Sequence, residues 1–260
     1  MKYATSKIMP AAKALLFILW CLCLMPPQCL AEDLLVSTAI SLKEALFDIA
    51  HDFEKTHKDV RVILNSASSG ELALQVKKGA PVDLFVSASP VEMQTLKRDG
   101  LLDGEAKPLA YNRLVVVSQN SEQPIKSLID LSNFGKVAIG NPETVPAGRY
   151  AKQALTKSGI FERLKTKHAL IFGQNAKALL TYVEQGNADA SMIYLSDALT
   201  SKDIGTPFLI PKNLTDPIEY EIACISRSEH KKLAQDFLKF ATSPQGNSYL
   251  AKHHFEKSWN

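Results

Sequence analysis

Short apolar runs alternate with stretches whose apolar residues recur at helical spacing. In the first such stretch Leu42, Ile49 and Phe53 fall on one helical face. An alternation of strands and amphipathic helices predicts a mostly parallel sheet flanked by helices. The elements expected in this first run are 34–37, 42–53, 60–64, 69–78, 82–86 and 90–98.

The same alternation begins again near residue 114, without repetition of the sequence itself. Because no Gly/Ser-rich linker separates the two runs, we expect two α/β lobes that are joined by strands. The elements expected in this second run are 114–117, 137–139, 147–157, 169–172, 176–185 and 190–194, followed by a strand at 219–226 and a helix at 231–240.

Residues 1–31 have the features of a secretory signal peptide. Three lysines precede an apolar run at 14–25, and Ala31 offers a small residue for cleavage. Twelve apolar residues span roughly 18 Å as a helix, short of the ~30 Å hydrocarbon core of a bilayer. We therefore expect cleavage after Ala31 and a periplasmic mature protein. Lipid modification of Cys29 is the weaker alternative, because Gln28 before it is not a small residue.

Removal of the signal peptide changes the net charge and the cysteine content of the mature chain. The three lysines of this segment account for the whole formal net charge of +3, so the mature chain is balanced and gives no support for binding to nucleic acid. Three of the four cysteines lie in the same segment. The remaining one, Cys224, lies in a strand-like alternation and is expected to be a small buried residue rather than a nucleophile.

Four predicted helices begin at small, hydroxylated or amide residues that directly follow a predicted strand. The first residues of these helices are near Ser41, Ser68–Gly70, Pro146–Gly148 and Asn175–Ala176. Ser41 with Glu44, and Ser68 with Glu71, match the capping box. Capping alone explains each junction. Together they also suit an anion site of neutral groups, because helix N-termini expose unpaired N–H groups beyond the carboxyl ends of strands.

Signatures of common enzymes are absent from the sequence. It contains no Gly-x-Ser-x-Gly, no phosphate-binding Gly-x-x-x-x-Gly-Lys-[Ser/Thr] and no His-Glu-x-x-His. The six histidines are scattered or adjacent, and do not form a metal-binding pattern. An exported enzyme with Ser41 or Ser69 as nucleophile is the alternative from another class, and no partnered base is visible for it.

Five stretches have an order and spacing that resemble the molybdate-binding proteins of bacterial molybdate ABC transporters. The resemblance extends from residue 32 to residue 260, and its most specific part is Pro-Glu-x-Val-Pro-Ala-Gly at 142–148. The five stretches are 39–45, 66–72, 79–88, 140–151 and 193–197.

This resemblance implies a two-lobed periplasmic binding fold of type II, with parallel and mixed sheets and two crossing strands at 114–117 and 219–226. The first lobe would comprise 32–116 and 219–260, and the second 117–218. The protein would bind molybdate, and also tungstate, without a cofactor, a metal-cation ligand or catalysis. It would act as a monomer and deliver the anion to a membrane permease with its ATPase. A binding protein for sulfate or phosphate is the alternative within this class.

The resemblance also assigns the ligand contacts. In the first lobe they fall on the hydroxyl and amide groups of Ser41 and Ser69. In the second lobe they fall on the backbone N–H groups of Ala147 and Ala176 and on the phenolic hydroxyl of Tyr194.

Overall fold

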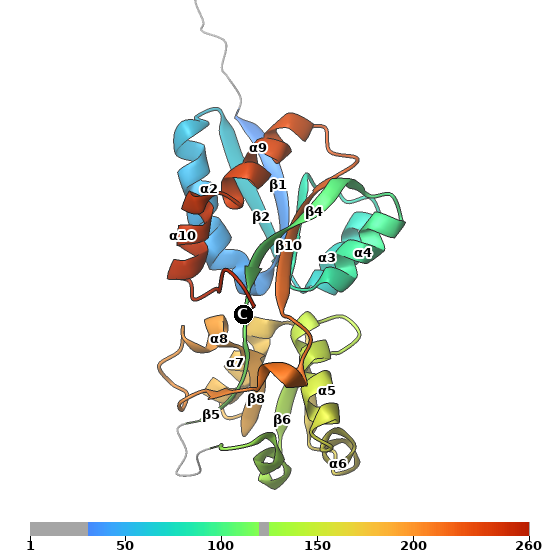
Figure 1. Ribbon diagram of the computed structural model, residues 1–260, viewed down its shortest axis with the longest axis vertical. Helices are drawn as coiled ribbons and strands as arrows, with labels where there is room; N and C mark the ends of the chain where they lie inside the picture. Colours follow the sequence, from blue (N-terminus) through green and yellow to red (C-terminus); the bar gives the residue numbers. More distant parts are fainter. Residues whose placement is uncertain (1–30, 120–124, 260) are drawn as a thin grey trace, which may run out of the picture. The chain divides into compact units, whose positions relative to one another are not determined.

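The computed structural model describes residues 31–119 and 125–259. The predicted signal peptide lies outside the described residues, except for Ala31. Within the described part the strands form two sheets of five strands each, and helices pack on both faces of each sheet. This arrangement confirms the predicted fold class (Figure 1).

The first sheet has the strand order β2-β1-β3-β10-β4. Strands β1, β2 and β3 are parallel, whereas β10 runs antiparallel to both β3 and β4. In Figure 1, α2, α9 and α10 lie on one side of this sheet, and α3 and α4 on the other. The strands are β1 (Glu32–Ala39), β2 (Val60–Ala67), β3 (Leu84–Ser87), β4 (Leu102–Tyr111) and β10 (Glu219–Ile225). The helices are η1 (Ile40–Leu42), α2 (Lys43–Thr56), α3 (Ser69–Lys77), α4 (Pro90–Arg98), α9 (Lys231–Ala241) and α10 (Pro244–Lys252).

The second sheet has the order β7-β6-β8-β5-β9 and the same mixture of directions. Strand β6 is parallel to β7 and β8, and β5 is antiparallel to β8 and β9. The strands are β5 (Leu114–Ser118), β6 (Val137–Gly140), β7 (Leu170–Gly173), β8 (Ala190–Tyr194) and β9 (Phe208–Leu209). The helices are η2 (Leu128–Asn133), α5 (Pro146–Lys157), α6 (Phe161–Thr166), α7 (Ala176–Glu184), α8 (Leu195–Ala198) and η3 (Lys212–Leu214).

Alternate residues of the strands face different cores, as the period of two in a strand requires. In β3, Leu84 and Val86 belong to the core cluster beneath α2, while Phe85 packs in the cluster with α3 and α4. This double-sided burial explains why the predicted strands read as continuous apolar runs.

The chain passes between the two sheets near Asn112 and again before β10. Asn112 and Arg113 separate β4 from β5, and the backbone N–H of Asn112 donates to the carbonyl of Ile218, 3.0 Å away. Strand β5 pairs entirely within the second sheet. The expected boundary after residue 116 therefore falls inside a strand, and the two lobe ranges remain a prediction.

Several of the described elements were not anticipated from the sequence. They are the edge strands β4 and β9, the polar helix α10, and the short helices η1, η2, α6, α8 and η3. In the part of the chain that the structure describes, every helix is too short or too polar to span a bilayer.

Candidate functional site

The carboxyl ends of neighbouring parallel strands lie level with each other in both sheets. Ala39 at the end of β1 is in register with Ala67 at the end of β2, and Gly140 of β6 with Gly173 of β7. The helices that follow these strands therefore begin side by side. Ligands of open α/β sheets bind at this edge.

A small cavity of about 210 Å³, a volume that includes space open to solvent, lies where these ends meet. Its walls come from both sheets, and all five residues predicted to bind the ligand are among them. From the first sheet and its helices the lining residues are Ala39, Ile40, Ser41, Ala67, Ser68, Ser69 and Ala88. From the second they are Val145, Pro146, Ala147, Ala176 and Tyr194. Their role in binding remains a prediction.

Ser69 is the first residue of α3, and the bond that its side chain accepts fixes its orientation. The backbone N–H of Ala88 donates to Ser69 Oγ over 3.0 Å. Because this bond occupies the acceptor side of the hydroxyl, the O–H hydrogen is free to donate into the cavity. Ser68 is the N-cap of α3 and accepts from the N–H of Glu71, but the return bond from the Glu71 side chain that would complete the predicted capping box is not formed.

Ser41 lies in the cavity wall, but the predicted capping box at this residue is wrong. Helix α2 begins at Lys43, its N-cap is Leu42, and no side chain caps it. Ser41 Oγ instead lies 2.9 Å from the hydroxyl of Tyr220, a residue 179 positions away on β10. The carboxylate of Glu44 pairs with Lys177 of α7 at 2.5 Å, which holds the pKa of Glu44 below its usual range.

Ala147 and Ala176 occupy the first turns of α5 and α7, where backbone N–H groups have no partner within the helix. Asn175 caps α7 by accepting from the N–H of Ala178 at 3.0 Å, as predicted. Gly148 explains the Pro-Ala-Gly sequence, because a Cβ at this position would overlap the carbonyl of Gly140 at the end of β6. The close approach of α5 to β6 places Ala147 at the cavity.

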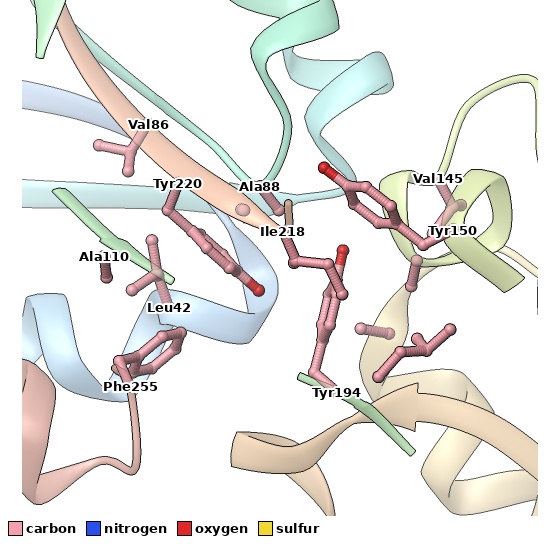
Figure 2. Packing of buried hydrophobic residues seen from close by; sticks show 14 of the residues in the cluster. Leu42, Val86, Ala88, Ala110, Val145, Tyr150, Tyr194, Ile218, Tyr220 and Phe255 are labelled. Carbon is pink, nitrogen blue, oxygen red and sulfur yellow. The ribbon is translucent and has the colours of Figure 1, made fainter. Parts of the chain in front are cut away.

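Tyr194 is the last residue of β8 and is 1% exposed. Its hydroxyl finds no hydrogen-bond partner among the described residues, and burial raises its pKa well above the usual value. Its ring packs edge to face with Tyr220 at a centroid distance of 5.8 Å, as Figure 2 shows. A buried hydroxyl without a partner is costly, so this atom points to a ligand that would accept its hydrogen bond.

Two ion pairs beside the cavity connect elements of the first sheet to elements of the second. Besides Lys177 with Glu44, Arg149 of α5 contacts the buried Glu92 of α4 at 2.5 Å. Sequence reasoning missed both pairs, because their partners lie 57 and 133 residues apart. The only signal was the position of Arg149 directly after Pro-Ala-Gly.

A second, larger cavity adjoins Ser41 and contains Asp197 of α8. Asp197 is 5% exposed as a residue, and its Oδ2 has no hydrogen-bond partner among the described residues. Burial raises the pKa of this carboxyl to about 7, although the charge of Lys177 opposes the shift. Sequence reasoning did not single out this residue.

Residues with other possible chemistry lie away from the small cavity. None of the residues that line it is a histidine. Cys224 is buried in β10, where burial raises the pKa of its thiol to about 11. Across residues 31–119 and 125–259, His, Cys, Asp and Glu side chains form no group of three or more suited to a metal ion.

Comparison with known proteins identifies the family of the chain. The family model of bacterial extracellular solute-binding proteins matches residues 34–256. The chain is 34% identical to YvgL of Bacillus subtilis, a protein provisionally named an ABC transporter substrate-binding lipoprotein, over 85% of each chain. It is 33% identical to the molybdate-binding protein ModA of Escherichia coli, over 85% of this chain and 87% of the relative. The structure of the periplasmic molybdate-binding protein of Azotobacter vinelandii superposes with a TM-score of 0.80, at 23% identity, over 86% of this chain and 99% of that one.

Proposed function

Because the chain belongs to the family of bacterial extracellular solute-binding proteins, we propose that it binds molybdate, and also tungstate, as the binding component of an ABC importer. The observation that carries the proposal is the small cavity, in which Ser41, Ser69 and Tyr194 meet the helix ends at Ala147 and Ala176. The Escherichia coli relative that bears the name of a molybdate-binding protein supports the choice of ligand.

The proposed contacts are all hydrogen-bond donors. Two serine hydroxyls, one phenol and backbone N–H groups would surround the anion at about 2.7 to 3.1 Å and replace its water. Molybdate at neutral pH carries no proton, so each of its oxygens can accept. Monohydrogen phosphate would place its own O–H against a donor, which costs about 1 to 3 kcal/mol. Sulfate is also free of protons, and its discrimination rests on size.

Donors from both sheets imply that binding requires the two halves to approach each other. The two ion pairs and the bond from the N–H of Gly70 to the carbonyl of Thr144, 3.2 Å long, would hold the approached form. In an open form the anion would enter and leave through the gap between the halves.

The proposed site of action is outside the cytoplasm, where the anion would be handed to a membrane permease coupled to an ATPase. We propose a monomer that is released by cleavage after Ala31. The lipoprotein description of YvgL keeps attachment through Cys29 as the alternative, and the mass of the N-terminal peptide of the exported protein separates the two.

The test is calorimetry of the chain from residue 32, freed of ligand by partial unfolding and refolding, against four sodium salts. We expect binding of molybdate and tungstate, and none of sulfate or phosphate at equal concentration. A ligand at 100 times its dissociation constant adds about 2.7 kcal/mol to the free energy of unfolding, so thermal shifts give an independent reading. Binding of sulfate or phosphate alone would reject the proposal.

A further inference from the structure

The hydroxyl of Tyr220 contacts Ser41, but Tyr220 is not among the residues that line the small cavity. Tyr220 belongs to β10, is fully buried and packs against Phe255 as well as Tyr194 (Figure 2). Within the described part of the chain its hydroxyl has two hydrogen-bonding neighbours, Ser41 Oγ at 2.9 Å and the Asn112 side-chain nitrogen at 3.4 Å. The direction of these two hydrogen bonds decides whether the Ser41 hydroxyl can donate to a ligand or accept from it.

The backbone around Asn112 fixes the orientation of its amide. The side-chain oxygen accepts from the N–H of Arg113 at 2.8 Å and from the N–H of Ser196 at 3.5 Å. Reversal of the amide would set its NH₂ group against these two donors. The nitrogen therefore faces Ser196 Oγ, at 2.8 Å, and the hydroxyl of Tyr220, and to both it can only donate.

The direction of the remaining bond follows from the number of hydrogens. The Tyr220 hydroxyl accepts from Asn112 and has one hydrogen of its own, for which Ser41 Oγ is the available acceptor. Burial raises the pKa of Tyr220 above its usual value, so the hydrogen stays in place at any physiological pH. Ser41 thus accepts from Tyr220, and its own O–H hydrogen has to point elsewhere.

Ser69 shows the same arrangement with a different donor behind it, the backbone N–H of Ala88. In both serines a donor from the protein occupies the acceptor side of the hydroxyl. Resting on the proposed function, we infer that Tyr220, oriented by Asn112, is a positioning residue that keeps Ser41 a donor toward the oxyanion and so disfavours anions that carry a proton.

The test is a double-mutant cycle on molybdate affinity with Ser41→Ala, Tyr220→Phe and the combined variant. Tyr220→Phe keeps the ring packing and should raise the dissociation constant by about 5- to 30-fold. In the Ser41→Ala background the same change should have less than a twofold effect, because Tyr220 acts through Ser41. Equal losses in both backgrounds would mean a merely structural role and would overturn the inference.

Tyr111→Phe is the matched control. Tyr111 of β4 is a partly buried tyrosine of the first sheet, and its hydroxyl donates to the carboxylate of Glu219 at 3.1 Å rather than contacting Ser41. We expect less than a twofold change in affinity. A loss as large as that of Tyr220→Phe would show that any buried hydroxyl matters equally, against the inference.

Selectivity gives a readout that packing does not affect. With Tyr220→Phe, the Ser41 oxygen can accept a hydrogen bond from monohydrogen phosphate, so the ratio of phosphate to molybdate affinity should rise at least fivefold. An unchanged ratio contradicts the inference.

Asn112→Asp provides a second variant should Tyr220→Phe fold poorly. A carboxylate accepts where the amide nitrogen donates, so Tyr220 turns its hydrogen toward residue 112 and Ser41 donates backward. Molybdate binding should therefore weaken. If the weakening comes from reorientation of the Ser41 hydroxyl, Asn112→Asp should cost less affinity in the Ser41→Ala background than in the parent. An equal loss of affinity in both backgrounds would contradict the inference. Failure of the parent protein to bind molybdate would refute the proposed function instead, which keeps the two outcomes distinct.

Discussion

The guanidinium of Arg149 lies 2.5 Å from the carboxylate of Glu92 and joins α5, beside the second sheet, to α4, beside the first. The two side chains differ in exposure, at 23% for Arg149 and 7% for Glu92. Among the described residues, Glu92 otherwise receives a single long bond, from the hydroxyl of Ser87 at 3.4 Å. In this form of the protein the carboxylate therefore depends on Arg149.

Arg149→Met should weaken molybdate binding by about 1 to 3 kcal/mol, less than the loss of one partner in a fully buried pair because Arg149 is partly exposed. Arg149→Met should destabilise only the closed form, because Glu92 is hydrated again when the halves separate. Calorimetry should show the effect while the denaturant midpoint of the empty protein changes little. The double variant with Glu92→Gln should recover part of the affinity, and no recovery would contradict this explanation.

Gly70→Ala should have opposite effects on binding and on stability. A Cβ at residue 70 would lie 2.5 Å from the carbonyl oxygen of Thr144, across the gap between the halves, so the closed form would be blocked. In the open form alanine favours helix α3 by about 0.5 to 1 kcal/mol relative to glycine. We expect at least a tenfold weaker affinity with an equal or higher denaturant midpoint. Unchanged affinity would show that the halves do not need this contact.

Tyr194→Phe and Ser69→Ala should both weaken binding, by about 1.5 to 3 kcal/mol each, but should differ in the empty protein. In the empty, open protein water can hydrate the Tyr194 hydroxyl, so its removal should change the free energy of unfolding by less than about 0.5 kcal/mol. Ser69→Ala removes the acceptor for the N–H of Ala88 and should lower that free energy. Urea titrations without ligand measure the difference, and a lower stability for both variants would contradict the assignment of the unpartnered hydroxyl.

Asp197 should make the stability fall as the pH rises from about 4 to 7. Its pKa is raised to about 7 in the folded protein, so the folded state holds a proton in this range that the unfolded state has released. Above pH 7 the loss is complete. Asp197→Asn should abolish this pH dependence. Its free energy of unfolding should exceed that of the parent by up to about 4 kcal/mol at pH 8 and differ little from it at pH 4. Asp59→Asn, at an exposed carboxylate, serves as the control, and parallel pH profiles for parent and Asp197→Asn would refute the prediction.

Several element boundaries were predictable because local chemistry sets them. Pro90 opens α4, Asn175 caps α7 and Ser68 caps α3, and each observed helix begins within one residue of its predicted start. Edge strand β4 was missed because Gly104, Pro108 and its charged residues are unfavourable in strands, and its pairing with β10 compensates.

The candidate site was predictable only in part. The resemblance supplied Ser41, Ser69, Ala147, Ala176 and Tyr194, and the structure brings them to one cavity. The residues that orient these side chains come from distant parts of the sequence. Ser41 does not cap a helix as expected, and its hydroxyl contacts Tyr220, 179 positions later in the chain. Local pattern carries no information about such contacts.

The donors behind the two serines also bear on the entropy of binding. The bonds from Ala88 to Ser69 and from Tyr220 to Ser41 restrict both hydroxyl groups when the chain folds, before any anion arrives. Ordering a mobile side chain at a binding interface costs about 0.5 to 1.5 kcal/mol. This cost is already included in the folding free energy, so the measured entropy of association should mainly reflect released water and the closing of the two halves.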